Sequence, residues 1–520
     1  MGATTMTRDT EQQERAAPGI DEAEVRSRID ALLNRRPAVG MAVGVVRESG
    51  LVFFQGHGVA DIASRTPVTE DTVFRIASIT KTLTAIAVMQ LHERGLIDLD
   101  APANDYLRAY RLVPGKPSFR PATVRHLLTH TAGLAEVVPP WGVVLPDWGE
   151  SVKVGHPLPS LAEYYRGRLR IAADPGTRFV YGDHSPATLG QLVEDVSGQP
   201  LAGYFREHIF EPLGMADSDL GRSDRVRSRL ATGYDLGANG PRAVPDREFV
   251  TAGAASVYST PRDMARYVAA LLGGGTNEHG SVLERATLAT MFAPQFQPDP
   301  RLPGMGLGFF RADLGGRPVV EHRGVMPGFN SQIVMAPDQG VGVMAFTNGA
   351  KDAALWLMTE SSGLLRWLLG VPDDRIRTDI PQHPELWPEI CGWYRLDAGL
   401  GDIRLRGIAG AGAEVFVRDG RLALRYLNPI PVMYRGFPLH PDDEDDPYAF
   451  RLDFSEFGIG TTRVVFSRDP GGGTMCLALE MMPLSLRRQP ARTNPRLWAT
   501  GALGALGATS AAIAIRQLRR

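Results

Sequence analysis

Ser78 and Lys81 are the two residues of this chain whose types and spacing best suit covalent chemistry. They stand three positions apart, so in a helix that begins at Ser78 their side chains share one face. A serine hydroxyl becomes a good nucleophile when a neighbouring base takes its proton. A partly desolvated lysine can assist, and a helix N-terminus offers a backbone N–H to an oxyanion. The pattern predicts an activated serine, although S-x-x-K also occurs by chance in long chains.

Lysine is rare in this chain, which gives Lys81 more weight. Of 56 basic residues only four are lysines, and arginine serves almost everywhere else. Arginine keeps its proton at any ordinary pH, whereas lysine can lose it. A lysine next to a candidate nucleophile therefore favours a role in proton transfer.

Two later segments carry further polar groups. Tyr181 and Asp183 follow a Pro-Gly turn and open a probable helix that Gly198 closes. A phenolate stabilised by nearby cations can act as a general base, although an isolated tyrosine here would be taken for a core residue. In the run 321–331, Gly324 permits close backbone approach. His322 could donate a hydrogen bond to substrate or to the tyrosine, or be an ordinary surface histidine.

The elements that must position these residues come from both ends of the first 370 residues. Apolar runs predict strands at 39–46, 51–59, 331–336 and 341–347, and helical spacing predicts helices at 21–33, 79–95 and 351–369. Helical segments and Pro/Gly-rich loops lie between them. We therefore expect an α/β (α+β) fold, in which an antiparallel sheet built from the two ends is flanked by helices and carries an inserted helical region.

Changes in composition along the chain predict its division into domains and connecting segments. Residues 1–20 predict a disordered tail, 21–370 a catalytic domain and 371–385 a polar, proline-containing linker. Short strands over 386–487 predict a small β-barrel or sandwich. The uncharged stretch 497–515 is a candidate transmembrane helix, or an Ala-rich helix docked on protein or membrane. Because residues 1–20 are polar and lack the apolar segment of a signal peptide, we expect a cytoplasmic protein, attached to the cytoplasmic side of the membrane if 497–515 is an anchor.

Several function classes are excluded or disfavoured by composition. A net charge of −2 argues against a nucleic-acid binder, and two cysteines rule out a disulfide scaffold or a cysteine-rich metal site. No metal-binding motif and no convincing nucleotide fingerprint occurs, so we expect no metal and no cofactor. His126 and His130 are interpreted as structural residues.

Taken in chain order, Ser78-x-x-Lys81, Tyr181-x-Asp183 and His322-x-Gly324 resemble the serine β-lactamase and penicillin-binding-protein superfamily. The similarity is greatest to its branch of class C β-lactamases, D-Ala-D-Ala peptidases and related esterases. Supporting segments at 124–134, 212–215 and 259–264 also look like that family's, and the β-rich region resembles the lipocalin-like domain of some members.

The resemblance implies roles for these residues. Ser78 would be the acylated nucleophile, and Lys81 and Tyr181 would share the proton transfers, with Tyr181 as the general base. The amides of Ser78 and Val325 would form the oxyanion hole. His322 would line the site where the family often has lysine. Asp183 stands where the family has asparagine, so its added negative charge should raise the pKa of Lys81 and repel substrate carboxylates.

The resemblance implies a serine hydrolase that acts on esters or related acyl compounds through an acyl-Ser78 intermediate. The enzymatic alternative is a β-lactamase, a D-stereospecific peptidase or a peptide-cyclising acyltransferase. A non-catalytic, membrane-tethered binding protein is the third possibility. The expected partner is a small-molecule or peptide acyl substrate, and the oligomeric state stays open.

Overall fold

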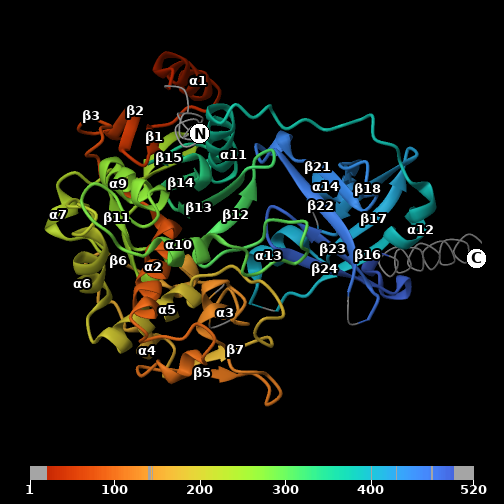
Figure 1. Cartoon of the computed structure of the whole chain (residues 1–520), viewed down its shortest axis with the longest axis horizontal. Helices are drawn as coiled ribbons and strands as arrows, with labels where there is room; N and C mark the ends of the chain where they lie inside the picture. Colours follow the sequence, from red (N-terminus) through yellow and green to blue (C-terminus); the bar gives the residue numbers. More distant parts are fainter. Residues whose placement is uncertain are drawn as a thin grey trace, which may run out of the picture.

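The computed structural model describes residues 20–138, 142, 144–399, 401–428, 430–469 and 472–496. Two antiparallel sheets organise these residues, one of seven strands and one of nine. The seven-stranded sheet and most helices occupy one side of the molecule, and the nine-stranded sheet, drawn in blue, occupies the other (Figure 1).

The seven-stranded sheet is built from both ends of the first 350 residues, as the apolar runs predict. Its first strand pairs with its last, with Met41 opposite Thr347. The strand order is β12-β13-β14-β15-β1-β2-β3. The strands are β1 (Gly40–Arg47), β2 (Gly50–Asp61), β3 (Thr66–Pro67), β12 (Phe310–Asp313), β13 (Pro318–Met326), β14 (Phe329–Ala336) and β15 (Val341–Thr347).

Both faces of this sheet are buried, because apolar residues occupy successive positions along its central strands. Val43 and Val45 of β1 pack with α1 (Glu22–Arg35) and α11 (Ala353–Leu368). Ala42 and Val46 point the opposite way, into the larger core beneath α9 (Pro261–Leu272). Since side chains alternate along a strand, one continuous apolar run supplies two layers of core.

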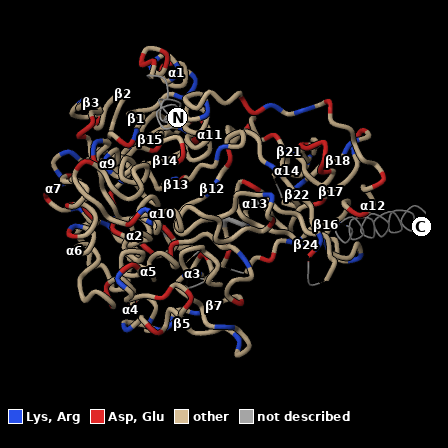
Figure 2. The backbone as a smooth tube through the Cα atoms, in the orientation of Figure 1, with Lys and Arg blue, Asp and Glu red and all other residues tan. Residues whose placement is uncertain are grey.

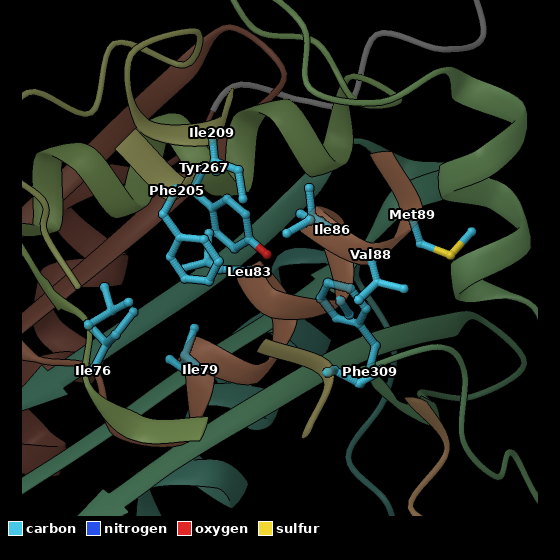
Figure 3. Close-up of a cluster of buried hydrophobic side chains, with 14 of the residues drawn as sticks. Ile76, Ile79, Leu83, Ile86, Val88, Met89, Phe205, Ile209, Tyr267 and Phe309 are labelled. Atoms are coloured by element: carbon cyan, nitrogen blue, oxygen red, sulfur yellow. The ribbon is translucent and has the colours of Figure 1, made fainter. Parts of the chain in front are cut away.

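Helix α2 (Thr80–Glu93) lies inside that larger core. Its residues from Thr80 to Leu91 are all buried. Figure 3 shows Leu83, Ile86 and Met89 of α2 among side chains that come from several other segments. A helix that is apolar on every side belongs in the interior of a protein. The segment that carries Ser78 and Lys81 therefore rests on a closely packed support.

The inserted region between the two halves of the sheet is mainly helical. Its remaining helices are α3 (Val124–Leu128), α4 (Leu161–Tyr164), α5 (His184–Ser197), α6 (Leu201–Phe205), α7 (Asp224–Arg227), α8 (Ala252–Ala255) and α10 (Arg285–Phe292). Its short strands are β4 (Phe74–Arg75), β5 (Arg111–Pro114), β6 (Ser151–Lys153), β7 (Arg168–Ile171), β8 (Tyr234–Gly237), β9 (Gly240–Ala243), β10 (Arg247–Phe249) and β11 (Tyr258–Ser259).

The C-terminal sheet is nearly closed into a barrel, since β19 and β21 also approach each other. It has its own apolar core. Its strands are β16 (Gly392–Leu396), β17 (Ala413–Arg418), β18 (Arg421–Tyr426), β19 (Phe437–Pro438), β20 (His440–Pro441), β21 (Ala449–Asp453), β22 (Thr461–Arg468), β23 (Met475–Leu479) and β24 (Leu484–Gln489). Short helices α12 (Trp387–Ile390), α13 (Ile403–Ala409) and α14 (Pro431–Arg435) accompany it. The expected fold class is thereby confirmed.

The segment predicted as a linker joins α11 to α12 as an extended path (Figure 1). The domain limits themselves stay a prediction. Residues 1–19 and the candidate transmembrane segment 497–515 lie outside the described residues, so the structure gives the anchor no support. Within the described ranges, no helix combines the length and apolar character needed to cross a membrane.

Candidate active site

Ser78 lies in a 3-10 turn, η2 (Ala77–Ile79), immediately before α2. Ala77 has the unusual φ of 48° for a residue with a side chain, which turns the chain sharply at this point. Two hydrogen bonds hold the turn: Ser331 Oγ donates to the Ile76 carbonyl at 2.8 Å, and the Ile76 amide donates to the Val257 carbonyl at 3.1 Å. The surrounding structure therefore keeps a partly exposed serine at the entrance to a buried helix.

Lys81 is almost completely buried and is surrounded by acceptors. Its Nζ donates to Ser78 Oγ at 2.9 Å, to Asp183 Oδ1 at 2.6 Å and to the Ala254 carbonyl at 3.2 Å. An ammonium group has three N–H donors, and three acceptors match it. These contacts are those of a protonated lysine. In its hydrogen bond with Lys81, Ser78 Oγ is the acceptor.

The charge on Lys81 is stabilised by its neighbours. Burial lowers the pKa of Lys81, but the Asp183 carboxylate and the Tyr181 phenol outweigh burial and place the pKa above its ordinary value. This is the direction expected from a carboxylate at position 183. A charged Lys81 cannot accept the Ser78 proton, so a different group has to act as the base.

Tyr181 is the predicted candidate for that base. It lies half-buried between β7 and α5, with Lys81 Nζ 5.1 Å from the centre of its ring. His130, which has a φ of 56°, packs against it with ring centres 4.8 Å apart. Phe310 lies on the same ring at 5.7 Å. These rings hold the phenol beside the Lys81 ammonium.

His322 completes the ring cluster from β13, 6.3 Å from the Tyr181 ring. Burial and the Lys81 charge lower the pKa of His322 far below its usual value, so the imidazole is neutral. Its Nδ1–H donates to the Arg323 carbonyl at 2.9 Å, and Nε2 is therefore an acceptor. In this tautomer Nε2 can accept a hydrogen bond from substrate or from the tyrosine, and the expected donation by His322 stays a prediction.

Gly324 brings strand β13 directly against the nucleophile turn. A Cβ at this position would lie 2.2 Å from the Ile76 carbonyl oxygen and 3.1 Å from Ala77 Cβ. Only glycine permits that approach. The next residue, Val325, is 47% exposed. The structure thus brings all seven predicted site residues into one region, although their chemical roles stay predictions.

The C-terminal sheet contacts the tyrosine loop, a connection that motif reasoning missed. Leu396 and Leu484 pack in one apolar cluster with Phe179 and Tyr181. Arg178 Nη1, on the same loop, donates to Asp402 Oδ2 at 2.8 Å, and Asp402 is completely buried. Residues separated by more than 200 positions therefore position the loop that carries the candidate base.

Breaking this ion pair should weaken both stability and activity. In Asp402→Asn, a mostly buried Arg178 loses its counter-charge, so we expect about 3 kcal/mol of lost unfolding free energy and a lower kcat for the Tyr181-dependent reaction. Urea unfolding and ester kinetics measure the two effects. Asp419→Asn, on the exposed turn between β17 and β18, is the matched control. Equal stability of the two variants would contradict the positioning role.

Two further residues of the site carried little sequence signal. Ala254 contributes only a carbonyl, which no motif reveals. His130 belongs to one of the supporting family segments, where the sequence predicts only a structural role, and its contact with Tyr181 appears only in the fold. The signal that could have found it is the family segment itself, which lies between the serine and the tyrosine.

Comparison with known proteins identifies the family. A family model described as "Beta-lactamase" matches residues 25–359, which is more than half of the chain and includes all seven site residues. This chain belongs to the beta-lactamase family. With the nucleophile turn and its lysine in place, it is a serine hydrolase of that family.

Curated relatives of the family carry different activity names. Esterase EstB of Burkholderia gladioli is 31% identical over 324 residues, covering 57% of this chain and 81% of the esterase. Penicillin-binding protein 4 of Amycolatopsis lactamdurans is 27% identical over 369 residues, covering 68% and 90%. The D-alanyl-D-alanine-carboxypeptidase/endopeptidase AmpH of Escherichia coli K12 is 28% identical over 372 residues, covering 67% and 92%.

A solved structure extends the likeness to the C-terminal sheet. The octameric penicillin-binding protein homologue from Pyrococcus abyssi superposes with a TM-score of 0.58 and 23% identity, covering 90% of this chain and all of that one. At this identity the likeness concerns the fold. It supports the resemblance of the C-terminal region to the additional domain of some family members.

Proposed function

We propose that this beta-lactamase family member hydrolyses carboxylic esters through an acyl-Ser78 intermediate. The phenolate of Tyr181, stabilised by the Lys81 ammonium, accepts the Ser78 proton as Oγ attacks the ester carbonyl. The amides of Ser78 and Val325 stabilise the oxyanion. Tyr181 then returns the proton to the departing alcohol. A water molecule then gives a proton to Tyr181 and attacks the acyl-enzyme; Tyr181 returns that proton to Ser78 Oγ as the carboxylic acid departs.

The Lys81–Asp183 pair is the observation that carries the choice of esters. Its 2.6 Å contact neutralises the cation of the nucleophile region, and the buried His322 is neutral as well. Around Tyr181 the site therefore offers little positive charge to a carboxylate close to the reacting carbonyl, such as the one a penicillin carries. The similarity to EstB is in line with this substrate class.

A direct comparison of two chromogenic substrates tests the proposal. We expect kcat/KM for p-nitrophenyl butyrate to exceed that for nitrocefin by about 100-fold, equivalent to about 3 kcal/mol of transition-state discrimination. The Ser78→Ala variant gives the background for both substrates. A nitrocefin value equal to or above the ester value would contradict the ester assignment.

The similarity to the Amycolatopsis and AmpH proteins favours the second candidate, a β-lactamase or D-stereospecific peptidase. A peptide-cyclising acyltransferase would share the acyl-enzyme and differ only in using an amine in place of water. D-Ala-D-Ala peptides and peptidyl esters, assayed beside the two chromogenic substrates, separate these activities. Turnover of the peptides above the esters would replace the first candidate with the second.

Replacing Asp183 with asparagine should favour β-lactams and change the pH profile. Removing the carboxylate takes away a repelling charge, so nitrocefin acylation should rise by about 10-fold. Because Asp183 raises the pKa of Lys81, its loss should also move the alkaline limb of kcat/KM for the ester, where Lys81 loses its proton, to lower pH. Stopped-flow acylation and a pH series measure the two effects. An unchanged acylation rate would refute the repulsion argument.

A further inference from the structure

A cavity that the proposed mechanism does not use opens beside the nucleophile turn, with a free volume of about 210 Å³. Among its lining residues, the charged side chains are those of Arg75, Arg222, Arg227, Arg247, Asp147 and Asp246. Elsewhere, basic and acidic residues are interspersed along the chain (Figure 2). Four arginines around one hollow are thus a local feature and not part of a large basic face.

The cavity lies next to Ser78 along two strands. Arg75 precedes Ser78 by three residues, and Met326 follows the candidate oxyanion residue Val325 directly. Gly324 brings these two strands into contact at Ile76 and Ala77. A chain of atoms that leaves the reacting carbonyl past Val325 would therefore run toward this hollow.

Arg75 is held rigidly in the wall of the cavity. Its Nη1 donates to Asp246 Oδ1 at 2.6 Å and to the Arg247 carbonyl at 2.7 Å. Its guanidinium lies over the ring of Tyr258 at 4.8 Å, and the Tyr258 hydroxyl donates to Asp246 Oδ2 at 3.0 Å. Both carboxylate oxygens of Asp246 therefore accept hydrogen bonds from residues of the protein, Arg75 and Tyr258.

The cavity keeps one cation in excess. Arg247 is paired with Asp147 at 2.6 Å, and Arg227 with Asp224, which is outside the lining, at 3.1 Å. Arg222 shares Asp246 with Arg75: its Nε lies 3.3 Å from Oδ2 but makes no hydrogen bond within the described structure. The single carboxylate of Asp246 balances the charge of only one of these two arginines. The side chain of Arg222 is 31% exposed, so its guanidinium can donate hydrogen bonds to a ligand.

The position of the leaving group indicates that the cavity faces the acyl group of the substrate. A leaving group must lie within reach of Tyr181, which returns its proton. Tyr181 packs with Phe310 and His322, whereas Met326 is at the far end of β13 from these contacts. The leaving alcohol and the cavity are therefore on different sides of the carbonyl.

We infer that this cavity binds a single carboxylate carried at the distal end of the acyl chain, so that the preferred substrates are monoesters of dicarboxylic acids. One surplus arginine suits a monoanion, and Arg–carboxylate pairing supplies the recognition. The inference rests on the proposed ester hydrolysis and adds the class of acyl group. Its carboxylate is distant from the reacting carbonyl and so does not meet Asp183.

Paired substrates and a matched variant test this inference. We expect native kcat/KM to be about 10-fold higher for p-nitrophenyl hydrogen adipate than for p-nitrophenyl hexanoate. Arg222→Met should abolish that preference, chiefly through KM, and leave the hexanoate value unchanged. Arg225→Met, which removes an exposed arginine three positions further along the chain, in helix α7 and outside the cavity lining, should keep that preference. A carboxylate on the leaving group, as in 4-carboxyphenyl hexanoate, should bring no preference.

Equal kcat/KM values for adipate and hexanoate esters, or an equal loss in both arginine variants, would overturn the carboxylate site and leave ester hydrolysis intact. Absence of turnover with every ester would instead refute the proposed function. In that case titration calorimetry of the full chain with adipate still tests the carboxylate site. Adipate binding that is lost in Arg222→Met and kept in Arg225→Met would support the carboxylate site. Absence of adipate binding to the native protein would overturn it.

Discussion

Replacing Ser78 with alanine should lower kcat/KM for p-nitrophenyl butyrate by on the order of 10⁴-fold or more. The methyl group cannot form the acyl intermediate, and Lys81 Nζ loses its Ser78 acceptor. The fold should persist, since Ser78 is partly exposed and the turn is held by Ser331 and Val257. Steady-state kinetics and a thermal melt of both proteins measure these expectations.

Ser118→Ala is the control for that experiment, because Ser118 is exposed in the catalytic region and should leave kcat/KM unchanged. A Ser78→Ala protein that kept more than a tenth of native activity would show that another residue, or water alone, attacks the ester.

Replacing Lys81 with methionine should lower kcat by about 10³-fold. Methionine nearly matches the length of the lysine stem and tolerates a buried site, so the packing of α2 is largely retained. The ammonium that stabilises the Tyr181 phenolate and binds Ser78 Oγ is lost, and Asp183 keeps an unbalanced charge.

Lys351→Met provides the matched control, since it removes an exposed lysine from the same chain. Ester kinetics and thermal melts of the two variants separate a catalytic role from a structural one. If Lys81→Met retained kcat within 10-fold of the native value, the charged lysine would have no part in proton transfer.

The strands and helices around the site could be predicted from the sequence because their patterns are local. The run 341–347 coincides with β15, and the expected helix 79–95 corresponds to α2. Periodicity places such elements but not their ends: α2 begins at Thr80, because Ala77 turns the chain and puts Ser78 in a 3-10 turn.

The residues of the candidate site could be predicted from motifs, but their charges and protonation could be inferred only from the three-dimensional contacts. The sequence places Asp183 in the position of the usual asparagine, and the structure adds the 2.6 Å contact that raises the pKa of Lys81. The tautomer of His322 follows from one carbonyl, that of Arg323, which no sequence pattern indicates.

Long-range contacts were outside the reach of sequence reasoning. Arg178 and Asp402 are ordinary charged residues in a chain rich in both, and only folding brings them to 2.8 Å. The same is true of the arginines around the cavity, which come from β4, α7, β10 and the loop that precedes α7. Residues without local periodicity or a motif become informative only when their neighbours are known.

The most direct test of the account is covalent labelling of the full chain with a fluorophosphonate, followed by peptide mass spectrometry. We expect one adduct per chain, located on Ser78, with labelling strongly reduced in Lys81→Met and absent in Ser78→Ala. An unlabelled native protein, or an adduct located on a different residue, would contradict the proposed acyl-Ser78 mechanism.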